Sequence, residues 1–308
     1  MRLLALLVLA LAVASSASAN VLWRGDYETG DLSQWAGVEG LTSRLTIVQS
    51  PVRQGKYALR TELRQGDYAN SGTRNEVENS SAQFNEVEGN DKWYAWSSMF
   101  ASDFPAPNTW QVFTQWHHSG LTGSPPLEFD VYGENIQLAH NGSTVLWRTP
   151  LVRGVWHDFV VHVYWSSTNG YVDLYYDGAK ALDHQATQTL YSGQYAYLKQ
   201  GLYRDASIAD VGVVYHDGMV MGTTLADVAP DLAAPPPVRV PDAGTPDPLP
   251  DAGATTPPVT PATDAGAPVK SASVYVLPHG CSHTPASFLA VLGLIAATFL
   301  FVGRRRRR

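Results

Sequence analysis

The sequence predicts an all-β sandwich or barrel for most of this chain of 308 residues, and three observations predict it. Apolar and polar residues alternate with a period of two in short aromatic or β-branched runs, which is typical of half-buried strands. Gly, Asn, Ser and Pro interrupt these runs roughly every ten residues, as the turns of a sandwich do. Helical periodicity is hard to find. Aromatic residues make up 11% of the chain and charged residues 16%, so a disordered chain and a coiled coil are excluded.

The N-terminal end differs from the body. Residues 1–19 combine one basic residue, an apolar run and the small residues Ala17-Ser18-Ala19, a pattern that predicts a secretory signal peptide. Residues 20–228 follow as the predicted folded body. We therefore expect an exported protein.

The C-terminal part contains two further kinds of sequence. Residues 229–279 are rich in Pro and contain three Asp-Ala-Gly repeats, so an extended linker is predicted. Residues 280–308 contain Cys281, an uncharged apolar stretch over 286–303 and five arginines. This order predicts a membrane span with its arginines in the cytoplasm, which would tether the body at the cell surface.

Charge and cysteine content narrow the classes of function. Over residues 20–230 there are 13 Lys and Arg against 23 Asp and Glu, a net charge of −10. An acidic body excludes a generic nucleic-acid binder. The chain's single cysteine is Cys281, so no disulfide can stabilise the body, which must bury an ordinary hydrophobic core. We expect a monomer that needs no cofactor.

Ten segments of the body are predicted as strands because each combines alternation with strand-forming residues. A two-residue hairpin turn is predicted at Asn169-Gly170, since both residues tolerate positive φ. In chain order the predicted strands are 56–64, 73–78, 92–100, 110–118, 127–133, 135–140, 156–166, 170–178, 195–204 and 211–222.

Alternation also predicts which side chains share a face. The face of 73–78 that carries Arg74 is polar, as is the face of 195–204 that carries Lys199 and Tyr203. In 110–118 one face is predicted to hold Gln111, Phe113, Gln115 and His117, and Trp116 on the other is expected in the core. If the three strands are neighbours in a concave sheet, Arg74, Gln115, His117, Lys199 and Tyr203 line one groove.

In these strands the sequence resembles the jelly-roll polysaccharide lyases, the clan of alginate, glucuronan and heparin lyases. The resembling segments are PVRQGKYALRTELR and TRNEVE, then QWH at 115–117, WHDFVVHVYWS with GYVDLYYDGAKAL, and YLKQGLYRD at 197–205. The last is similar to the clan's Tyr-Lys-x-Gly-x-Tyr signature, and QWH to its Gln-x-His. The resemblance implies a concanavalin-like β-jelly-roll sandwich with a concave substrate groove, and cleavage of uronate polymers by β-elimination.

β-Elimination removes a proton α to a carboxylate, so the site needs donors for that carboxylate, a base for the proton and an acid for the leaving oxygen. The resemblance implies Arg74 and Gln115 as the donors, with His117 and Tyr203 as base and acid. Tyr203 serves as both where the departing groups lie on one face of the sugar, and His117 is the base where they lie on opposite faces. Substrate-binding roles are expected for Lys199, Tyr197, Arg64 and Arg204. The charge of −10 favours a plain polyuronate such as glucuronan or alginate over a sulfated polymer.

Two other classes of function fit parts of the sequence. Glu128, Asp130 and Glu134 resemble the carboxylates of family 16 glycoside hydrolases, but the third comes one residue late, past Gly133. A non-catalytic carbohydrate-binding sandwich of the lectin or laminin-G type would share the aromatic richness. Unsaturated uronate products would distinguish a lyase from both.

Two further expectations concern a metal and the tail. Glu28 and Asp217 are candidate ligands for a structural calcium ion, because their positions resemble those of a calcium site in related sandwiches. Gly280-Cys281, the apolar span and the arginines resemble a myxobacterial surface-sorting tail. That resemblance implies a tail that is cut and a lipid on Cys281, whereas a plain single-span anchor is the alternative.

Overall fold

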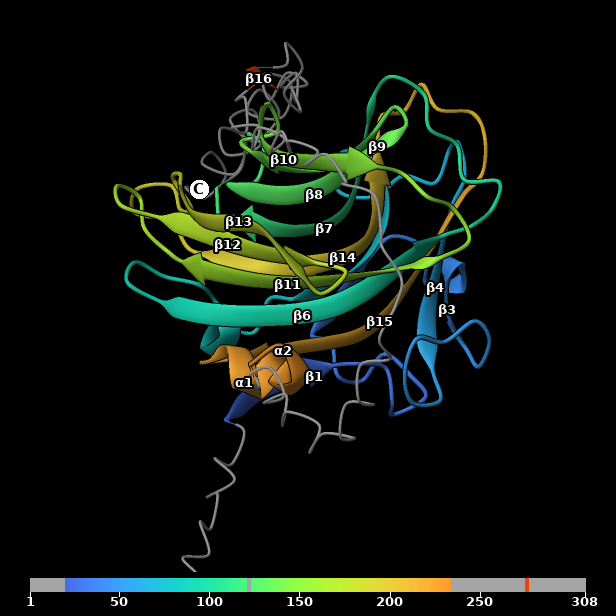
Figure 1. The fold of residues 1–308 in the computed structure, drawn as a ribbon. Coiled ribbons are helices and arrows are strands. Elements are labelled where there is room, and N and C mark those ends of the chain that lie inside the picture. The colour runs from blue at the N-terminus through green and yellow to red at the C-terminus, as the bar shows by residue number, and fades with distance from the viewer. Residues whose placement is uncertain (1–19, 121–122, 234–274, 277–308) are drawn as a thin grey trace, which may run out of the picture.

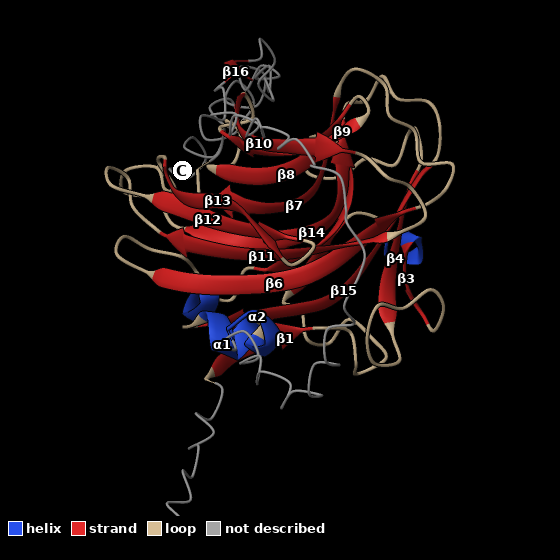
Figure 2. Ribbon diagram, in the orientation of Figure 1, coloured by secondary structure: helices blue, strands red, loops and turns tan. Residues whose placement is uncertain are grey.

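The computed structural model describes residues 20–120, 123–233 and 275–276 of the chain. These residues form two antiparallel β-sheets packed face to face (Figures 1 and 2), so the predicted all-β sandwich is confirmed. The predicted signal peptide, most of the predicted linker and the tail from 280 onward lie outside the described residues. Among the described helices none is both long and apolar enough to cross a membrane.

Sheet A has eight strands, seven of them in the order β13-β12-β11-β6-β15-β4-β3, with β1 paired to β15. Their bounds are β1 Val21–Gly25, β3 Leu45–Val48, β4 Ala58–Leu63, β6 Asp91–Phe100, β11 Trp156–Tyr164, β12 Tyr171–Tyr176, β13 Ala179–Ala186 and β15 Gly212–Gly222.

Sheet B has eight strands in the order β16-β10-β9-β8-β7-β14-β5-β2. Their bounds are β2 Gly37–Glu39, β5 Thr73–Asn79, β7 Trp110–His118, β8 Leu127–Tyr132, β9 Asn135–His140, β10 Thr144–Pro150, β14 Ala196–Arg204 and β16 Tyr275–Val276. Every strand pair in both sheets is antiparallel, which is the pairing that short turns allow.

The described part of the chain also contains four short helices: η1 Thr42–Arg44, η2 Ala82–Phe84, α1 Leu225–Val228 and α2 Pro230–Ala233. Leu225, Val228 and Leu232 pack against a small apolar cluster around Val160 on the outward face of sheet A. Because Leu232 takes part in this packing, the folded body continues past the predicted boundary at 228.

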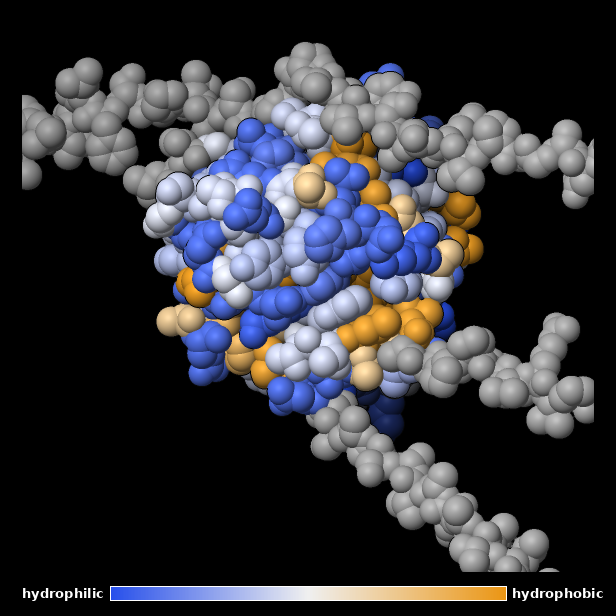
Figure 3. All heavy atoms as spheres, turned by 60° about the vertical axis from the view of Figure 1, so that its left-hand side comes forward, coloured by the Kyte–Doolittle hydropathy of each residue, from blue (hydrophilic) through white to orange (hydrophobic). Residues whose placement is uncertain are grey.

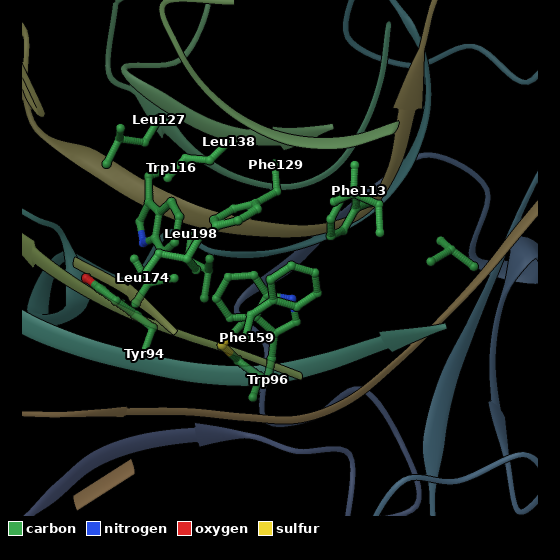
Figure 4. Close-up of a cluster of buried hydrophobic side chains, with 14 of the residues drawn as sticks. Tyr94, Trp96, Phe113, Trp116, Leu127, Phe129, Leu138, Phe159, Leu174 and Leu198 are labelled. Atoms are coloured by element: carbon green, nitrogen blue, oxygen red, sulfur yellow. The ribbon is translucent and has the colours of Figure 1, made fainter. Parts of the chain in front are cut away.

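The core lies between the two sheets, and aromatic rings are packed together among its aliphatic side chains (Figure 4). Trp96 stacks on Phe159 with 5.0 Å between ring centroids, and Phe129 meets Trp96 edge to face at 5.2 Å. Trp116 is fully buried among these rings, as alternation predicts. Apolar side chains are thus drawn inside, and the side of the molecule seen in Figure 3 is mostly hydrophilic.

All ten predicted strand segments contain a strand, whereas β1, β2, β3, β10, β13 and the two-residue β16 were missed. β1, β2 and β3 are five residues or fewer, and the charged sequence AKALDHQA of β13 shows no clear alternation. A hairpin does join β11 and β12 at the predicted position, but its connection is longer than two residues, and neither Asn169 nor Gly170 has a positive φ. Among the described residues, the two-residue turn with positive φ at both positions is Asp177-Gly178 (47° and 79°), between β12 and β13.

The predicted face of β7 is corrected by a bulge. Val112 pairs with Asp130 and Thr114 with Phe129, which leaves Phe113 as the extra residue. Phe113 turns into the core and is 1% exposed. Beyond the bulge, Gln115 keeps its predicted face, because alternation resumes from Thr114.

Candidate functional site

The outward surface of β5, β14, β7 and β8 carries the candidate site, and we call it the polar face. The sequence does not give the order of the strands in the sheet. The structure places β14 between β5 and β7. Lys199 of β14 pairs with Gln115 of β7, and Tyr203 pairs with Arg74 of β5. Because paired residues of antiparallel strands point to the same side, these four side chains share one face.

Glu39 of β2 links the two cations of the polar face. Its Oε2 lies 3.0 Å from Arg74 Nη1, and its Oε1 lies 2.7 Å from Lys199 Nζ. Burial raises the pKa of Glu39, but the charges of Lys199 and Arg74 outweigh burial and hold that pKa at about 2. Both cations are therefore partly neutralised within the protein.

Glu76 of β5 joins the two groups that the sequence assigned to a substrate carboxylate. Gln115 Nε2 donates to Glu76 Oε1 at 2.6 Å, and Arg74 Nη1 lies 3.4 Å from Glu76 Oε2. Gln115 Oε1 and Arg74 Nε have no hydrogen-bond partner among the described residues. Arg74 and Gln115 thus already bind one carboxylate between them, and each keeps a polar atom for a further partner.

Tyr203 is held against Arg74. The guanidinium carbon of Arg74 lies 3.8 Å from the centroid of the Tyr203 ring, and Trp110 meets the same ring edge to face at 4.7 Å. Gly72 makes room for the ring, since a Cβ there would lie 2.6 Å from Tyr203 Cε2. The hydroxyl of Tyr203 is therefore carried by a fixed ring beside a cation.

His117 is a neutral imidazole with a defined tautomer. Its Nδ1 lies 2.7 Å from the backbone oxygen of His118, and because a carbonyl only accepts, Nδ1 carries the proton. Nε2 is then the basic nitrogen. Burial, with the nearby charge of Lys199, lowers the pKa of His117 to about 3. Across the strand pair its ring faces Tyr197, with 5.6 Å between centroids.

The predicted acid and base do not lie together. His117 pairs with Tyr197, which precedes Tyr203 by six residues on β14. Tyr203 pairs with Val112, five residues from His117 on β7 with the bulged Phe113 between them, so at ~3.3 Å per residue His117 and Tyr203 are roughly 15 Å apart along the strands. Tyr203 shares its end of the polar face with Arg74, whereas His117 shares its end with Tyr197.

Two residues assigned to substrate binding lie elsewhere. Arg64 follows β4 of sheet A and binds Glu62, with 2.5 Å between Nε and Oε1. Arg204 neighbours Tyr203 in sequence and therefore points to the opposite side of β14, where it is 1% exposed and donates to the backbone oxygen of Ile208 at 3.4 Å. Neither arginine reaches the polar face.

Glu39 was not predicted from the sequence to belong to the polar face, and Glu128 and Asp130 were considered only as possible hydrolase carboxylates. Glu39 lies on a strand of three residues that gives no sequence signal. Glu128 and Asp130 of β8 do lie on the polar face, as their alternation in 127–132 allows, since Glu128 pairs with Gln115. Glu134 does not join them. It lies in the turn before β9, binds Arg153 through both oxygens at 2.8 and 3.0 Å, and is 66% exposed.

The candidate calcium ligands hold a loop. Glu28 Oε1 accepts the backbone N–H groups of Lys56 and Tyr57 at 2.9 and 3.0 Å, and Asp217 Oδ2 accepts those of residues 53 and 54 at 2.6 and 3.1 Å. Burial raises the pKa of Asp217 to about 6. Within the described residues no three His, Cys, Asp or Glu side chains are grouped so that they could hold a metal ion. Calcium binding stays a prediction.

Strand β14 is fixed from the core side by two buried groups. Tyr27 Oη donates to Gln200 Oε1 at 2.7 Å. His216 of β15 donates from Nε2 to the Gly201 carbonyl at 3.0 Å, while its Nδ1 accepts from the Ser98 hydroxyl at 3.0 Å. Burial lowers the pKa of His216 to about 3, so the ring is neutral. These bonds lie between Lys199 and Tyr203 along the strand and position both.

The chain is similar to known proteins both in sequence family and in fold. The family model described as polysaccharide lyase matches residues 27–220, more than half of the chain. Among solved structures, endo-β-1,4-glucuronan lyase from the fungus Trichoderma reesei has a TM-score of 0.56 at 19% identity, over 68% of this chain and 99% of that one. The catalytic domain of a family 131 glycoside hydrolase from Coprinopsis cinerea has a TM-score of 0.52 at 17% identity, over 68% and 99%. These two likenesses establish the fold. No curated protein matched.

Proposed function

This chain belongs to the polysaccharide lyase family, and we propose that it cleaves a uronate-containing polysaccharide, such as glucuronan or alginate, by β-elimination on the polar face. The observation that carries the proposal is the meeting of Arg74, Gln115, Lys199 and Tyr203 on adjacent strands. A purely structural sheet has no need of this set on one outward surface.

The chemistry requires that the C5 proton of a uronate leaves, that the C4–O bond breaks and that the C4=C5 double bond forms. We assign Arg74 and Gln115 to the carboxylate of the cleaved unit, where negative charge develops as the proton departs. The carboxylate of Glu76 now lies between these two groups, which supports the assignment, because it shows that their donors converge on a carboxylate.

Tyr203 is the group we assign to proton transfer. Its ring is packed against the Arg74 guanidinium, which holds the phenol beside the groups assigned to the carboxylate. A single tyrosine that removes the C5 proton and returns a proton to the leaving oxygen suits sugars whose departing groups lie on one face. The distance between His117 and Tyr203 along the sheet supports this single-residue route over a His117–Tyr203 pair.

His117 keeps a second role in the proposal. With Nε2 unprotonated and Tyr197 opposite, it could serve as base for a uronate bound at its own end of the face, where departing groups lie on opposite faces of the sugar. Polymers of the two stereochemical classes therefore test the two ends separately.

The test is a panel of polyuronates of both stereochemical classes, assayed for the absorbance of unsaturated product. We expect absorbance with at least one unsulfated polyuronate. New reducing ends without that absorbance would favour a hydrolase, and binding without either product would favour a carbohydrate-binding module. Preference for heparin over every unsulfated polymer would overturn the substrate class.

We also propose that the protein is exported through residues 1–19 and tethered at the cell surface through residues 280–308, with residues 234–279 as spacer. The support is sequence alone: the apolar leader, the apolar run 286–303 and the arginines after it. Mass spectrometry of the protein from its native membrane fraction tests this. An uncut chain with unmodified Cys281 would favour a plain anchor, and recovery only from the cytoplasm would overturn export.

A further inference from the structure

Two carboxyl groups of β8 extend the polar face beyond the proposed catalytic residues. Glu128 pairs with Gln115 on β7, and Asp130 pairs with Val112 on β7 and with Gln137 on β9. Both side chains are almost completely buried. The family 16 glycoside hydrolase pattern also needs Glu134, which is bound to Arg153 away from this face. That pattern therefore does not explain why Glu128 and Asp130 lie on the polar face.

The surroundings of the pair provide little positive charge. Asp130 Oδ2 accepts from Gln137 Nε2 at 3.2 Å, and Gln137 Oε1 in turn accepts from Arg148 Nη2 at 3.0 Å, so the cation acts through an amide. The polar or titratable groups that face the pair are Gln115 on β7, Glu76 on β5, Gln137 on β9, Arg148 on β10 and Tyr191 in the loop before β14.

Burial favours the protonated form of both carboxyls. Burial, together with the charges of Asp130 and Glu76, raises the pKa of Glu128 well above its usual range. Burial raises the pKa of Asp130 to about 7. A protonated carboxyl is a hydrogen-bond donor, and leaving such a donor unpaired costs on the order of 1–3 kcal/mol.

Unused polar atoms converge here. Glu128 Oε2 and Asp130 Oδ1 have no hydrogen-bond partner among the described residues. The fully buried Gln115 directly opposite Glu128 likewise keeps its Oε1 without a described partner. Donors and an acceptor that the fold itself does not use call for a ligand that carries both kinds of group, as a uronate does with its carboxylate and hydroxyls.

We propose that Glu128 and Asp130, with Gln115 opposite, form a second subsite, which binds a uronate unit through their unpartnered polar atoms. The inference rests on the proposed function, because it takes the polymer to run across the polar face. It also explains how an acidic face can hold an anionic polymer. Arg74 and Lys199 are already paired with Glu39, so a neighbouring uronate needs donors that carry no charge.

The subsite has a pH signature. Once Glu128 and Asp130 lose their protons, they repel a carboxylate but still accept from a sugar hydroxyl. We therefore expect the affinity for a uronate oligosaccharide to fall above about pH 7, by up to about tenfold per pH unit. The affinity for the same oligosaccharide with its carboxyls reduced to alcohols should not fall.

Titration calorimetry from about pH 5.5 to about pH 8.5, with both oligosaccharides, measures this directly. Asp130→Asn and Glu128→Gln keep a neutral donor and cannot ionise, so each should flatten the pH dependence of uronate binding. Glu134→Gln makes the same chemical change at the exposed Arg153 pair and should retain the full slope. Thermal unfolding of each variant shows that it is folded.

Three outcomes would overturn the subsite: a flat profile for the wild type, an unchanged slope in both Asp130→Asn and Glu128→Gln, or an equal slope for the reduced oligosaccharide. The last would assign these groups to sugar hydroxyls. Binding that depends on pH as described, with no unsaturated product from any polymer, would leave the subsite standing and remove the proposed lyase activity instead.

Discussion

The outward faces of the two sheets differ in how far their charged side chains are exposed to solvent. On sheet A, His162 lies between two carboxylates, with its Nδ1 2.9 Å from Asp173 Oδ2 and its Nε2 2.5 Å from Asp91 Oδ1. Lys180 pairs with Asp173 at 3.3 Å. Asp91 and Lys180 are each about half exposed, so water can solvate them in either the paired or the unpaired state.

On the polar face of sheet B, comparable charges are buried. The side chains of Arg74, Glu76 and Lys199 are each less than 5% exposed. Removing ions from water costs several kcal/mol per ion, which their mutual attraction repays only with good geometry. Stability alone gives no reason to bury this network, whereas a site that must bind charge away from water does. The comparison therefore points to the polar face, and four experiments can break or sharpen it.

The largest expected effect is on catalysis. Tyr203→Phe removes the hydroxyl assigned to proton transfer and should lower the rate of unsaturated product formation by about 10²–10⁴-fold. Tyr171→Phe is the matched change on sheet A, where the ring stacks on Tyr164, and should leave the rate unchanged. Equal rates for the two variants in the absorbance assay would remove Tyr203 from the mechanism.

The next effect is on stability. Arg74→Ala leaves the buried Glu76 without its cation and Glu39 with Lys199 alone, and should lower the free energy of unfolding by about 3–5 kcal/mol. Lys180→Ala on sheet A breaks solvated pairs and should cost less than about 1 kcal/mol. Denaturant unfolding monitored by tryptophan fluorescence measures both. Similar losses would mean that the two faces do not differ as described.

The third effect concerns acid stability behind the polar face. The pKa of His216 falls from about 6.5 in the unfolded chain to about 3 in the fold, so below pH 6.5 the unfolded chain binds a proton that the folded chain does not bind. The contribution of His216 to the free energy of unfolding is therefore fully present above pH 6.5 and is lost as the pH falls, by about 2 kcal/mol at pH 5. His216→Gln should make the loss of stability at acid pH, the acid limb, shallower and leave the part that His117, whose pKa is also about 3, contributes.

The control for that measurement is His184→Gln, at an exposed position on β13 of sheet A, which should keep the wild-type acid limb. Denaturant unfolding at a series of pH values between about 5 and 7.5 gives the slopes. If His216→Gln keeps the wild-type slope, another group controls the acid limb, and the bond to Gly201 does not set the state of the ring.

The smallest expected effect is that of chelation. Glu28 and Asp217 already accept backbone N–H groups of the loop between residues 53 and 57, so a calcium ion bound there would add little, and we expect a chelator to lower the melting temperature only slightly. A melting temperature that falls on chelation and recovers with calcium would establish the ion that the sequence suggested. Glu28→Gln would then abolish the recovery.

Residue pattern alone was enough for ten of the described strands and for the polarity of most of their faces. Alternation in 73–78 and 195–204 placed Arg74, Lys199 and Tyr203 outward, because side chains of a strand point alternately to its two sides whatever its neighbours are. The same local rule put Trp116 in the core. It failed at Phe113, where a bulge adds a residue that no local pattern marks.

The sequence by itself determined that this protein is an all-β sandwich with an acidic body and a set of lyase-like residues on outward faces. Only the tertiary structure decided which of them meet. Strand order and register, set by packing between distant segments, put Arg74 beside Tyr203, moved His117 to the other end of the face and left Arg64 on the other sheet. Burial, likewise a property of the whole fold, raises the pKa of Glu128 and of Asp130.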